Sequence, residues 1–256
     1  MRTFTVEAVV IRTSKYGEGD LLLHLYAPDR GKIEAIAWGC RKPNSTKRGG
    51  VQLLNYGLFL IRESKGYYHV EQCEAKESYS HLKGDLPRLL YATYIAELLD
   101  QWTEPGYGQP ALFQLFLYCL GLLEKGEVPP SLVARFFEAK LMKIEGYQPM
   151  LERCASCGRP VKGEVYFSPV LGGVLDGECR RGDAQARPIS PAALRLLRLL
   201  FRTEPGRLGR VPYSPAAGEE VKEIMEEYIG QRLERRIKSR RVLALVEKPP
   251  RGRKER

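Results

Sequence analysis

Three cysteines and one aspartate are the residues whose types and spacing most clearly indicate chemistry. Cys154 and Cys157 stand two residues apart, and two thiolates with this spacing on a turn can bind one tetrahedral zinc ion. Asp176 and Cys179 repeat this spacing, and the 18 residues between the two pairs lie in the range of a zinc ribbon. Because a carboxylate oxygen also binds zinc, the sequence predicts a site of three cysteines and one aspartate for one structural Zn²⁺.

Other interpretations of this cluster remain open. The segment could be a relic knuckle that lost a ligand and folds without metal, or one with water as the fourth ligand. A catalytic zinc is disfavoured because no histidine or evident general base lies nearby. A redox role is weaker still, since the pair lies outside a strand-helix pattern. The remaining cysteines, Cys40, Cys73 and Cys119, are expected to be reduced packing residues.

Signatures of enzymes are otherwise absent from the sequence. It has no phosphate-binding glycine loop, no dinucleotide fingerprint and no nucleophile elbow. His24, His69 and His81 lie in or beside expected strands and have no catalytic partners in sequence. We therefore expect a protein that is not an enzyme.

The charge distribution indicates a polyanionic partner. The 256 residues include 41 Lys and Arg against 31 Asp and Glu, a net charge of +10. Residues 1–80 hold 12 basic and 9 acidic side chains, residues 81–231 hold 18 and 19, and residues 232–256 hold 11 and 3. Two basic ends around a neutral middle favour binding to nucleic acid or to another anionic surface.

Two basic stretches are the expected nucleic-acid contacts. Residues 38–50 contain four basic side chains and no acid, and residues 232–241 contain six basic side chains beside Glu234. Trp38 or Tyr56 could offer a stacking face for bases, although Trp38 suits a core equally well. The predicted DNA-binding residues are Arg12, Lys15, Arg30, Lys32, Arg41, Lys42, Lys47, Arg48, Arg235, Arg236, Lys238, Arg240 and Arg241.

The elements that must position these residues change along the chain. β-Branched and aromatic residues broken by turn residues predict five strands, near 5–12, 20–26, 31–38, 54–63 and 67–73. Pro28 to Gly31 is a turn sequence that predicts a hairpin between the second and third strands. Five short strands within about 75 residues favour a small barrel, with an OB-fold as the leading candidate.

Helical periodicity begins at Leu86. Apolar residues predict helices from Leu86 to Leu99, from Ala111 to Leu123 and after Pro130, where Ser131 is a possible cap. Ser190 and Ser214 each precede a proline and are expected to cap two later helices. The fold class is therefore α+β: a barrel followed by a helical domain with an inserted zinc-ribbon-like module.

These elements predict domain boundaries. We expect an OB-fold DNA-binding domain at 1–80, a helical bundle at 81–148 and 188–246, a zinc-finger-like insertion at 149–187 and a disordered basic tail at 247–256. The sequence shows no signal peptide and no uncharged run of 18 residues, which predicts a cytoplasmic protein.

The order of barrel, helices and Cys-x-x-Cys insertion resembles the RecO family of bacterial recombination mediators. The resemblance covers nearly the whole chain. The agreeing residues are Val9 to Leu23 with Gly17 and Asp20, Gly31, Gly39-Cys40-Arg41-Lys42 with Ser45, Cys154-Ala155-Ser156-Cys157, Gly172-Gly173, and Tyr228 to Leu243 with Lys238-Ser239-Arg240. Asp176 stands where the family often has a further cysteine.

The resemblance implies a protein of the RecF pathway, associated with the bacterial nucleoid, that binds single- and double-stranded DNA and anneals complementary strands. It implies that RecR cooperates in loading recombinase onto strands coated by single-strand-binding protein. The barrel and its basic surface would contact DNA, with Arg41, Lys42, Lys47 and Arg48 at the family's basic loop. The helical domain would receive the acidic, apolar C-terminal tail of single-strand-binding protein.

Two other classes of protein remain open from the residues alone. One is an RNA- or ribosome-associated protein with an OB-fold and a zinc ribbon, which would prefer RNA to DNA of the same sequence. The other is a zinc-dependent hydrolase of nucleic acid, which would show metal-dependent cleavage.

Overall fold

The structure is a computed structural model that describes residues 2–233, 237–240 and 243. The chain divides into two compact units. The first, here called the barrel unit, contains residues up to Gly126 and those from Ile237 onward; the second, the helical unit, runs from Glu127 to Arg236. Within the described ranges, each helix is too short or too polar to cross a membrane.

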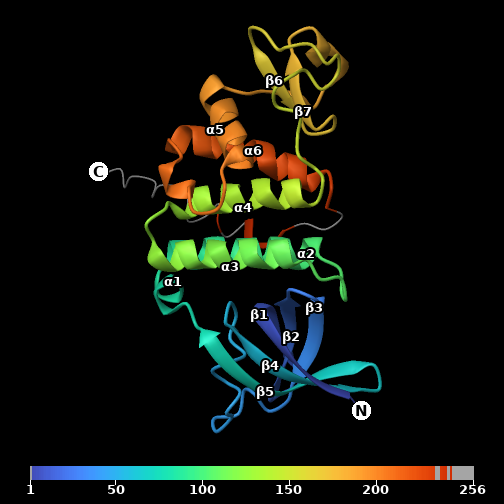
Figure 1. Cartoon of the computed structure of the whole chain (residues 1–256), viewed down its shortest axis with the longest axis vertical. Coiled ribbons are helices and arrows are strands. Elements are labelled where there is room, and N and C mark those ends of the chain that lie inside the picture. The colour runs from blue at the N-terminus through green and yellow to red at the C-terminus, as the bar shows by residue number, and fades with distance from the viewer. Residues whose placement is uncertain (1, 234–236, 241–242, 244–256) are drawn as a thin grey trace, which may run out of the picture. The chain divides into compact units, whose positions relative to one another are not determined.

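Five strands close into a barrel in the first unit (Figure 1). The strands are β1 (Arg2–Tyr16), β2 (Asp20–Ala27), β3 (Gly31–Ala37), β4 (Tyr56–Ser64) and β5 (Tyr67–Glu77). Their order around the barrel is β1-β2-β3-β5-β4, and β1 pairs with β4 to close it. The β3–β5 pairing is parallel and the other four are antiparallel. This confirms the expected α+β class and its OB-like barrel.

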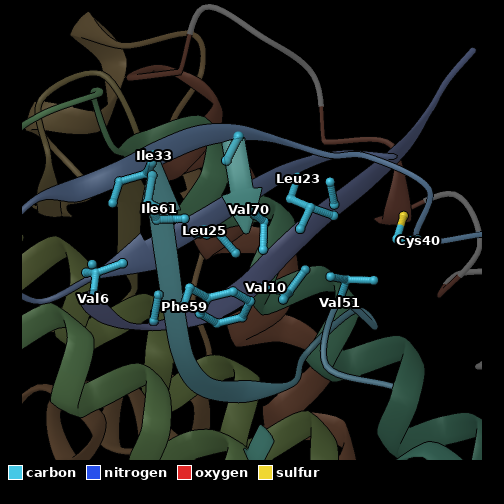
Figure 2. Packing of buried hydrophobic residues seen from close by; sticks show 14 residues of the cluster. Val6, Val10, Leu23, Leu25, Ile33, Cys40, Val51, Phe59, Ile61 and Val70 are labelled. Carbon is cyan, nitrogen blue, oxygen red and sulfur yellow. The ribbon is translucent and has the colours of Figure 1, made fainter. Parts of the chain in front are cut away.

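Alternating apolar residues fill the barrel. Val6, Ala8 and Val10 of β1 point into the same core as Leu23 and Leu25 of β2, together with residues of the other strands (Figure 2). A β-bulge after Val10 shifts the register of β1 against β2. After this bulge Arg12 pairs with His24, on the outer side of the barrel. A core that needs one face of every strand fixes which side chains remain for the outside.

The predicted hairpin between β2 and β3 is confirmed. Ala27 pairs with Gly31, which has a positive φ of 61°. A Cβ atom on Gly31 would lie 2.1 Å from the carbonyl oxygen of Tyr107, so a larger residue has no room there. The turn is therefore covered by the loop that contains Tyr107.

In the barrel unit the strands are followed by the helices α1 (Ser80–Gly84), α2 (Leu86–Trp102) and α3 (Pro110–Lys125). The long helices confirm the two apolar periods found in the sequence. The carboxylate of Glu124 accepts hydrogen bonds from the backbone N–H groups of His81 and Leu82, which start α1. Phe113 of α3 packs against Tyr26 and Tyr56 of the barrel.

A buried carboxylate joins α2 to three strands. The side chain of Asp100 is 6% exposed, and its Oδ1 lies 2.5 Å from Nδ1 of His24. Arg12 contacts the same carboxylate at 3.4 Å, and Nζ of Lys32 lies 3.6 Å away and donates to the Asp100 carbonyl. Burial acts to raise the pKa of Asp100, but the His24 hydrogen bond and the positive charges of His24, Lys32 and Arg12 prevail and lower it.

The helical unit contains α4 (Pro130–Ile144), α5 (Pro191–Arg202) and α6 (Pro215–Gly230). Ser190 and Ser214 cap α5 and α6 as predicted, each accepting a hydrogen bond from the backbone N–H three residues on. Ser131 is not a cap. Pro130 is already the first residue of α4, so Ser131 lies inside the helix and its hydroxyl bonds to that of Tyr213.

The compact units place α1, α2 and α3 with the barrel, whereas the domain boundaries expected from the sequence place them in a helical domain; those boundaries stay a prediction. The basic tail expected at 247–256 lies outside the described residues.

Replacement of Asp100 by Asn should lower the free energy of unfolding by about 3 kcal/mol, because Lys32 is only 13% exposed and would lose its carboxylate. The native pKa of Asp100 lies below its ordinary value of 3.8. Its stabilising contribution is therefore complete above that value and decreases as the pH falls below it. Urea unfolding at neutral and acidic pH measures both effects.

The matched control is Glu104→Gln, which removes an exposed carboxylate of the same unit. This variant should keep the stability and acid sensitivity of the wild type. An Asp100→Asn variant as stable as the wild type at pH 7, with an unchanged pH profile, would contradict the role assigned to the buried carboxylate.

Candidate nucleic-acid interface and metal centre

The loop between β3 and β4 holds four of the predicted basic residues, and the β1–β2 turn fixes its beginning. The backbone N–H of Gly39 donates to Oδ1 of Asp20 at 2.6 Å. Arg41 donates from its backbone to the Gly19 carbonyl, and from its guanidinium to the carbonyl of Glu18 at 2.8 Å. The family-like segment Gly39 to Lys42 therefore lies against the turn that follows Lys15 and Tyr16.

The end of the same loop is held by β5. Nζ of Lys47 donates to the Val70 carbonyl at 3.1 Å, and the Cys73 thiol donates to the Lys47 carbonyl. The predicted role of Cys40 and Cys73 as packing residues is confirmed, since Cys40 is buried in the barrel core and Cys73 packs against it. Cys119 is buried in α3.

These basic residues carry no local neutralisation by carboxylates. Within the part of the chain that the structure describes, Arg41, Lys42, Lys47 and Arg48 form no ion pair with Asp or Glu, and neither does Lys15. We call these five residues the basic rim. Such a group of uncompensated charges is the electrostatic footprint of phosphate binding.

The other basic residues predicted in the barrel are placed differently. Lys32 is largely buried at Asp100, and Arg12 contacts Asp100 while its side chain is 54% exposed. Arg30 stacks on Phe4 beside the covered β2–β3 turn. That turn lies at the opposite end of the hairpin from the basic rim, roughly 20 Å away over seven paired residues. The structure thus does not gather all the predicted residues into one groove.

An aromatic group lies next to the basic rim. Trp38 directly follows β3 and is 45% exposed. Its indole stacks on His69 of β5 and meets the edge of Tyr16 at the end of β1. Tyr56, the other suggested stacking residue, packs on Phe113 and donates to Glu7; its burial and this carboxylate raise the pKa of Tyr56 to about 12.

The sequence alone did not single out Tyr16 and His69 as neighbours of Trp38. They come together through register: Tyr16 pairs with Asp20, and Ile36 pairs with His69 across the parallel strands. Alternation could have suggested that these side chains share the outer face, but only the parallel β3–β5 pairing specifies the contact.

The second predicted basic stretch is only partly described. The backbone N–H groups of Lys238 and Ser239 each donate to the carboxylate of Glu97 on α2 at 2.7 Å, so this segment returns to the barrel unit. Lys238 is exposed and Arg240 is half-buried. Arg235, Arg236 and Arg241 lie outside the described residues.

The four predicted metal ligands meet in the helical unit. The Sγ atoms of Cys154, Cys157 and Cys179 and a carboxylate oxygen of Asp176 all lie within 4.8 Å of one another. Metal–sulfur bonds of about 2.3 Å in a tetrahedron give ligand separations of roughly 3.8 Å, so a small contraction would complete the site. We call these four residues the metal cluster, and they could hold a metal ion.

The hydrogen bonds and the crowded ionisable groups of the metal cluster favour the binding of a cation. Oδ1 of Asp176 accepts from the backbone N–H of Cys179, which orients Oδ2 toward Cys157. This backbone hydrogen bond is the main cause that lowers the pKa of Asp176 to about 2. In contrast, the hydrogen bond with Cys157 raises the pKa of Cys179 to about 12. Three thiols and a carboxylate cannot all ionise at this separation unless a cation balances their charge.

A small sheet, whose strands the sequence analysis did not predict, carries Asp176 of the metal cluster. It consists of β6 (Val165–Ser168), β7 (Gly173–Asp176) and β8 (Arg187–Pro188) in the order β7-β6-β8. The segment that leads into Cys154 pairs with β7 at Gly173, where a Cβ atom would lie 2.6 Å from the Met150 carbonyl oxygen. Short apolar runs at β6 and β7 were the signal that attention to turn residues alone missed.

A cavity of about 890 Å³ lies between this module and α5. Its apolar lining comes from Val165, Tyr166, Pro188, Ile189 and Leu194, and its charged lining includes Arg195, Arg198, Glu164 and Glu220. Glu220 is engaged by the backbone and hydroxyl of Ser190. Arg198 donates to the Leu151 carbonyl, which leaves Arg195 as the exposed cation on this side of α5.

The comparisons with known proteins cover most of the chain. Residues 1–79 match the family described as Recombination protein O N terminal, and residues 83–241 match Recombination protein O C terminal. The chain belongs to the RecO family. Its relatives include a DNA repair protein RecO of Desulfitobacterium hafniense, 39% identical over 93% of this chain and 88% of the relative, and one of Pelotomaculum thermopropionicum, 35% identical over 98% of both. The DNA repair protein RecO of Moorella thermoacetica is 38% identical over 93% of this chain and 89% of the relative.

RecO membership decides between the classes that the residues left open. The chain is a DNA repair protein of this family. The family names denote recombination and repair. DNA binding by the OB-like barrel is consistent with this family.

Proposed function

We propose that this RecO protein is a mediator of the RecF pathway that binds single- and double-stranded DNA and anneals complementary strands. With RecR, it would help to load recombinase onto DNA coated by single-strand-binding protein. The observation that carries the proposal is the basic rim, a group of uncompensated lysines and arginines on an OB-like barrel of a DNA repair family.

The geometry supports binding through the phosphate backbone. Lys42 and Arg48 are exposed, and Arg41 is fixed by carbonyl groups that leave its positive charge without a carboxylate. Contacts of this kind are independent of base sequence, as expected for a protein that must act at any break or gap. The exposed Lys238, held at Glu97 of α2, adds a further positive charge to the barrel unit.

Annealing then follows from electrostatics and needs no covalent chemistry. Two complementary strands repel each other through their phosphates, and bound cationic side chains offset this repulsion. A protein that holds both strands also raises the effective concentration of one for the other. The rate would therefore decrease as salt screens the basic surface.

Simultaneous replacement of Arg41, Lys42, Lys47 and Arg48 by Ala should weaken binding to all DNA sequences alike. If each contacts one phosphate, the slope of log K against log salt should fall in magnitude by about 3 for single strands, because each contact contributes roughly 0.7. Fluorescence anisotropy with labelled oligonucleotides at several salt concentrations measures this slope.

A matched control removes four exposed charges from elsewhere: Lys125, Lys143, Arg207 and Arg210. This variant has the same net charge as the rim variant but should keep the wild-type slope. If the rim variant also keeps that slope, the DNA site lies on another surface.

We further propose that the metal cluster binds one structural zinc ion. Thiolate and carboxylate ligands in a tetrahedral arrangement are typical of zinc, and the backbone bond to Asp176 supplies the outer contact that orients a ligand. The buried core around Cys154 is small in the described part of the chain: Leu175 and Ala186 are buried with it, and Ala155, Val161, Tyr166 and Cys179 pack against them half-buried. A core of this size supplies little hydrophobic stabilisation, so the metal would hold the module together.

The purified protein should contain about one zinc per chain, and Cys157→Ala should remove it. Asp176→Cys should retain the ion, since it restores the commoner set of four cysteine ligands. Elemental analysis gives the metal content, and thermal unfolding with and without a chelator should show a lower Tm for the metal-free module.

Cys73→Ala serves as the control because this cysteine belongs to the barrel. It should keep the full zinc content. A wild-type protein that holds no zinc, takes none up on incubation and unfolds at the same temperature with chelator would refute the metal proposal.

We propose that the C-terminal tail of single-strand-binding protein binds in the cavity beside α5. Its apolar walls suit the apolar residues of such a tail, and Arg195 offers a cation to its acidic residues. Glu164 and Glu220 oppose this, but Glu220 is already hydrogen-bonded to Ser190. A tail seated there would bring the mediator to DNA that is already coated.

A further inference from the structure

We propose that Trp38 stacks on an unpaired nucleobase and gives the barrel site a preference for single strands. This inference rests on the DNA-binding function proposed above and assigns the ligand of one part of that site. The basic rim would hold phosphates of any DNA, whereas Trp38 would recognise the aromatic face that only an unpaired base offers.

Trp38 is an unusual residue to leave in water. Nearly half of its surface is exposed, although indole is among the largest apolar side chains. It is also not a loose loop residue, because it directly follows β3 and its neighbour Gly39 is bonded to Asp20 at the start of β2. The strand ends thus hold a large aromatic surface toward solvent.

His69 fixes the orientation of the indole. The two rings stack at 6.1 Å between centroids and 25° between planes. The indole N–H donates to Nδ1 of His69 at 2.9 Å. Since an indole nitrogen can only donate, Nδ1 must be the unprotonated acceptor, and the imidazole proton sits on Nε2. The hydrogen bond and the stacking together keep Trp38 from rotating freely.

Tyr16 extends the aromatic surface. Its ring lies 5.8 Å from that of Trp38 at an angle of 76°, and it is 44% exposed. Tyr16 comes from the end of β1, Trp38 from the end of β3 and His69 from β5. A platform built from three strands is preorganised, so little conformational entropy is lost when a base stacks on it.

The basic rim places side chains that could bind phosphate beside this platform. Arg41 is three residues from Trp38, which limits their separation to about 11 Å along the chain. Nζ of Lys47 bonds to the carbonyl of Val70, the residue after His69. A strand whose phosphates contact Arg41 or Lys47 would therefore have its bases within reach of Trp38.

The two kinds of contact differ in what they recognise. Phosphates are equally accessible in single strands and duplexes, but bases in a duplex are paired and stacked on one another. Aromatic stacking of an unpaired base tolerates any sequence. Trp38 thus supplies selectivity for strand state, which the cationic residues alone cannot provide.

The chain provides a direct reporter, because Trp38 and Trp102 are its two tryptophans. In a Trp102→Phe variant, all indole fluorescence comes from Trp38. We expect titration with oligothymidine to quench this fluorescence strongly, while a duplex of equal length binds with little quenching. An abasic oligonucleotide of the same length retains the phosphates but should cause no quenching and bind more weakly.

Substitutions separate stacking from folding. Trp38→Ala should weaken binding of oligothymidine by roughly 5- to 150-fold, the range measured for one stacked base, and leave duplex binding within about twofold. His69→Ala should reproduce part of this loss. His69→Asn should keep most of the wild-type affinity for oligothymidine, because its side-chain oxygen can accept the indole N–H in place of Nδ1.

The outcomes distinguish this inference from the proposed function. Equal affinity for oligothymidine and the abasic strand, without quenching, would overturn the role of Trp38 while leaving phosphate binding by the rim intact. No binding to any strand or duplex would overturn both. The fluorescence titration keeps Trp38 in place, so it decides the matter even if Trp38→Ala does not fold.

Discussion

The buried carboxylate of Asp100 determines how the barrel unit can be used. One side chain on α2 engages Arg12 of β1, His24 of β2 and Lys32 of β3, so a single helix is fixed across three neighbouring strands. A carboxylate in this position is costly to bury unless cations and hydrogen bonds compensate it. The three partners supply that compensation; His24 and Lys32 are largely buried in the contact, whereas the side chain of Arg12 stays 54% exposed.

The contact of α2 with the strands leaves one end of the β2–β3 hairpin, the end opposite its turn, free for other contacts. There the turn after β1, the loop after β3 and strand β5 meet, held together by bonds from Gly39, Arg41 and Lys47. Positive charge and exposed aromatic surface therefore occur together at one end of the barrel. The opposite turn, which carries Arg30, is closed by the Tyr107 backbone.

The sheet module of the helical unit is stabilised in a different way. It is too small to be stabilised by its own core, and it packs on the helices through specific contacts. Phe167 packs edge-on against Tyr228 of α6, and the Tyr228 hydroxyl donates to the Tyr147 carbonyl. The crowded sulfur and carboxylate ligands would contribute the remaining stability only when a cation neutralises them.

Much of this architecture could be predicted from local patterns. β-Branched and aromatic residues between turn residues indicated the five strands, Pro28 to Gly31 indicated the hairpin, and Ser190 and Ser214 indicated helix starts. The metal ligands could also be predicted from the sequence, because their spacing along the chain is itself the signal.

Contacts between residues distant in sequence could not be predicted in this way. Asp100 lies 88 residues from Arg12 and 68 from Lys32, and no local pattern reports that pairing. The prediction that Arg12, Lys15, Arg30 and Lys32 all contact DNA treated the cations of the barrel as equivalent. Only the register of the closed barrel separates the residues that bind Asp100 from those that remain free of carboxylates.

The most direct test of the account is the annealing rate of complementary DNA strands coated with single-strand-binding protein, with and without this chain, at low and high salt. We expect strong acceleration that needs no ATP, produces no cleavage, decreases at high salt and weakens when the coating protein lacks its C-terminal tail. An unchanged annealing rate at both salt concentrations, with DNA binding intact, would contradict the proposal that this protein is an annealing mediator.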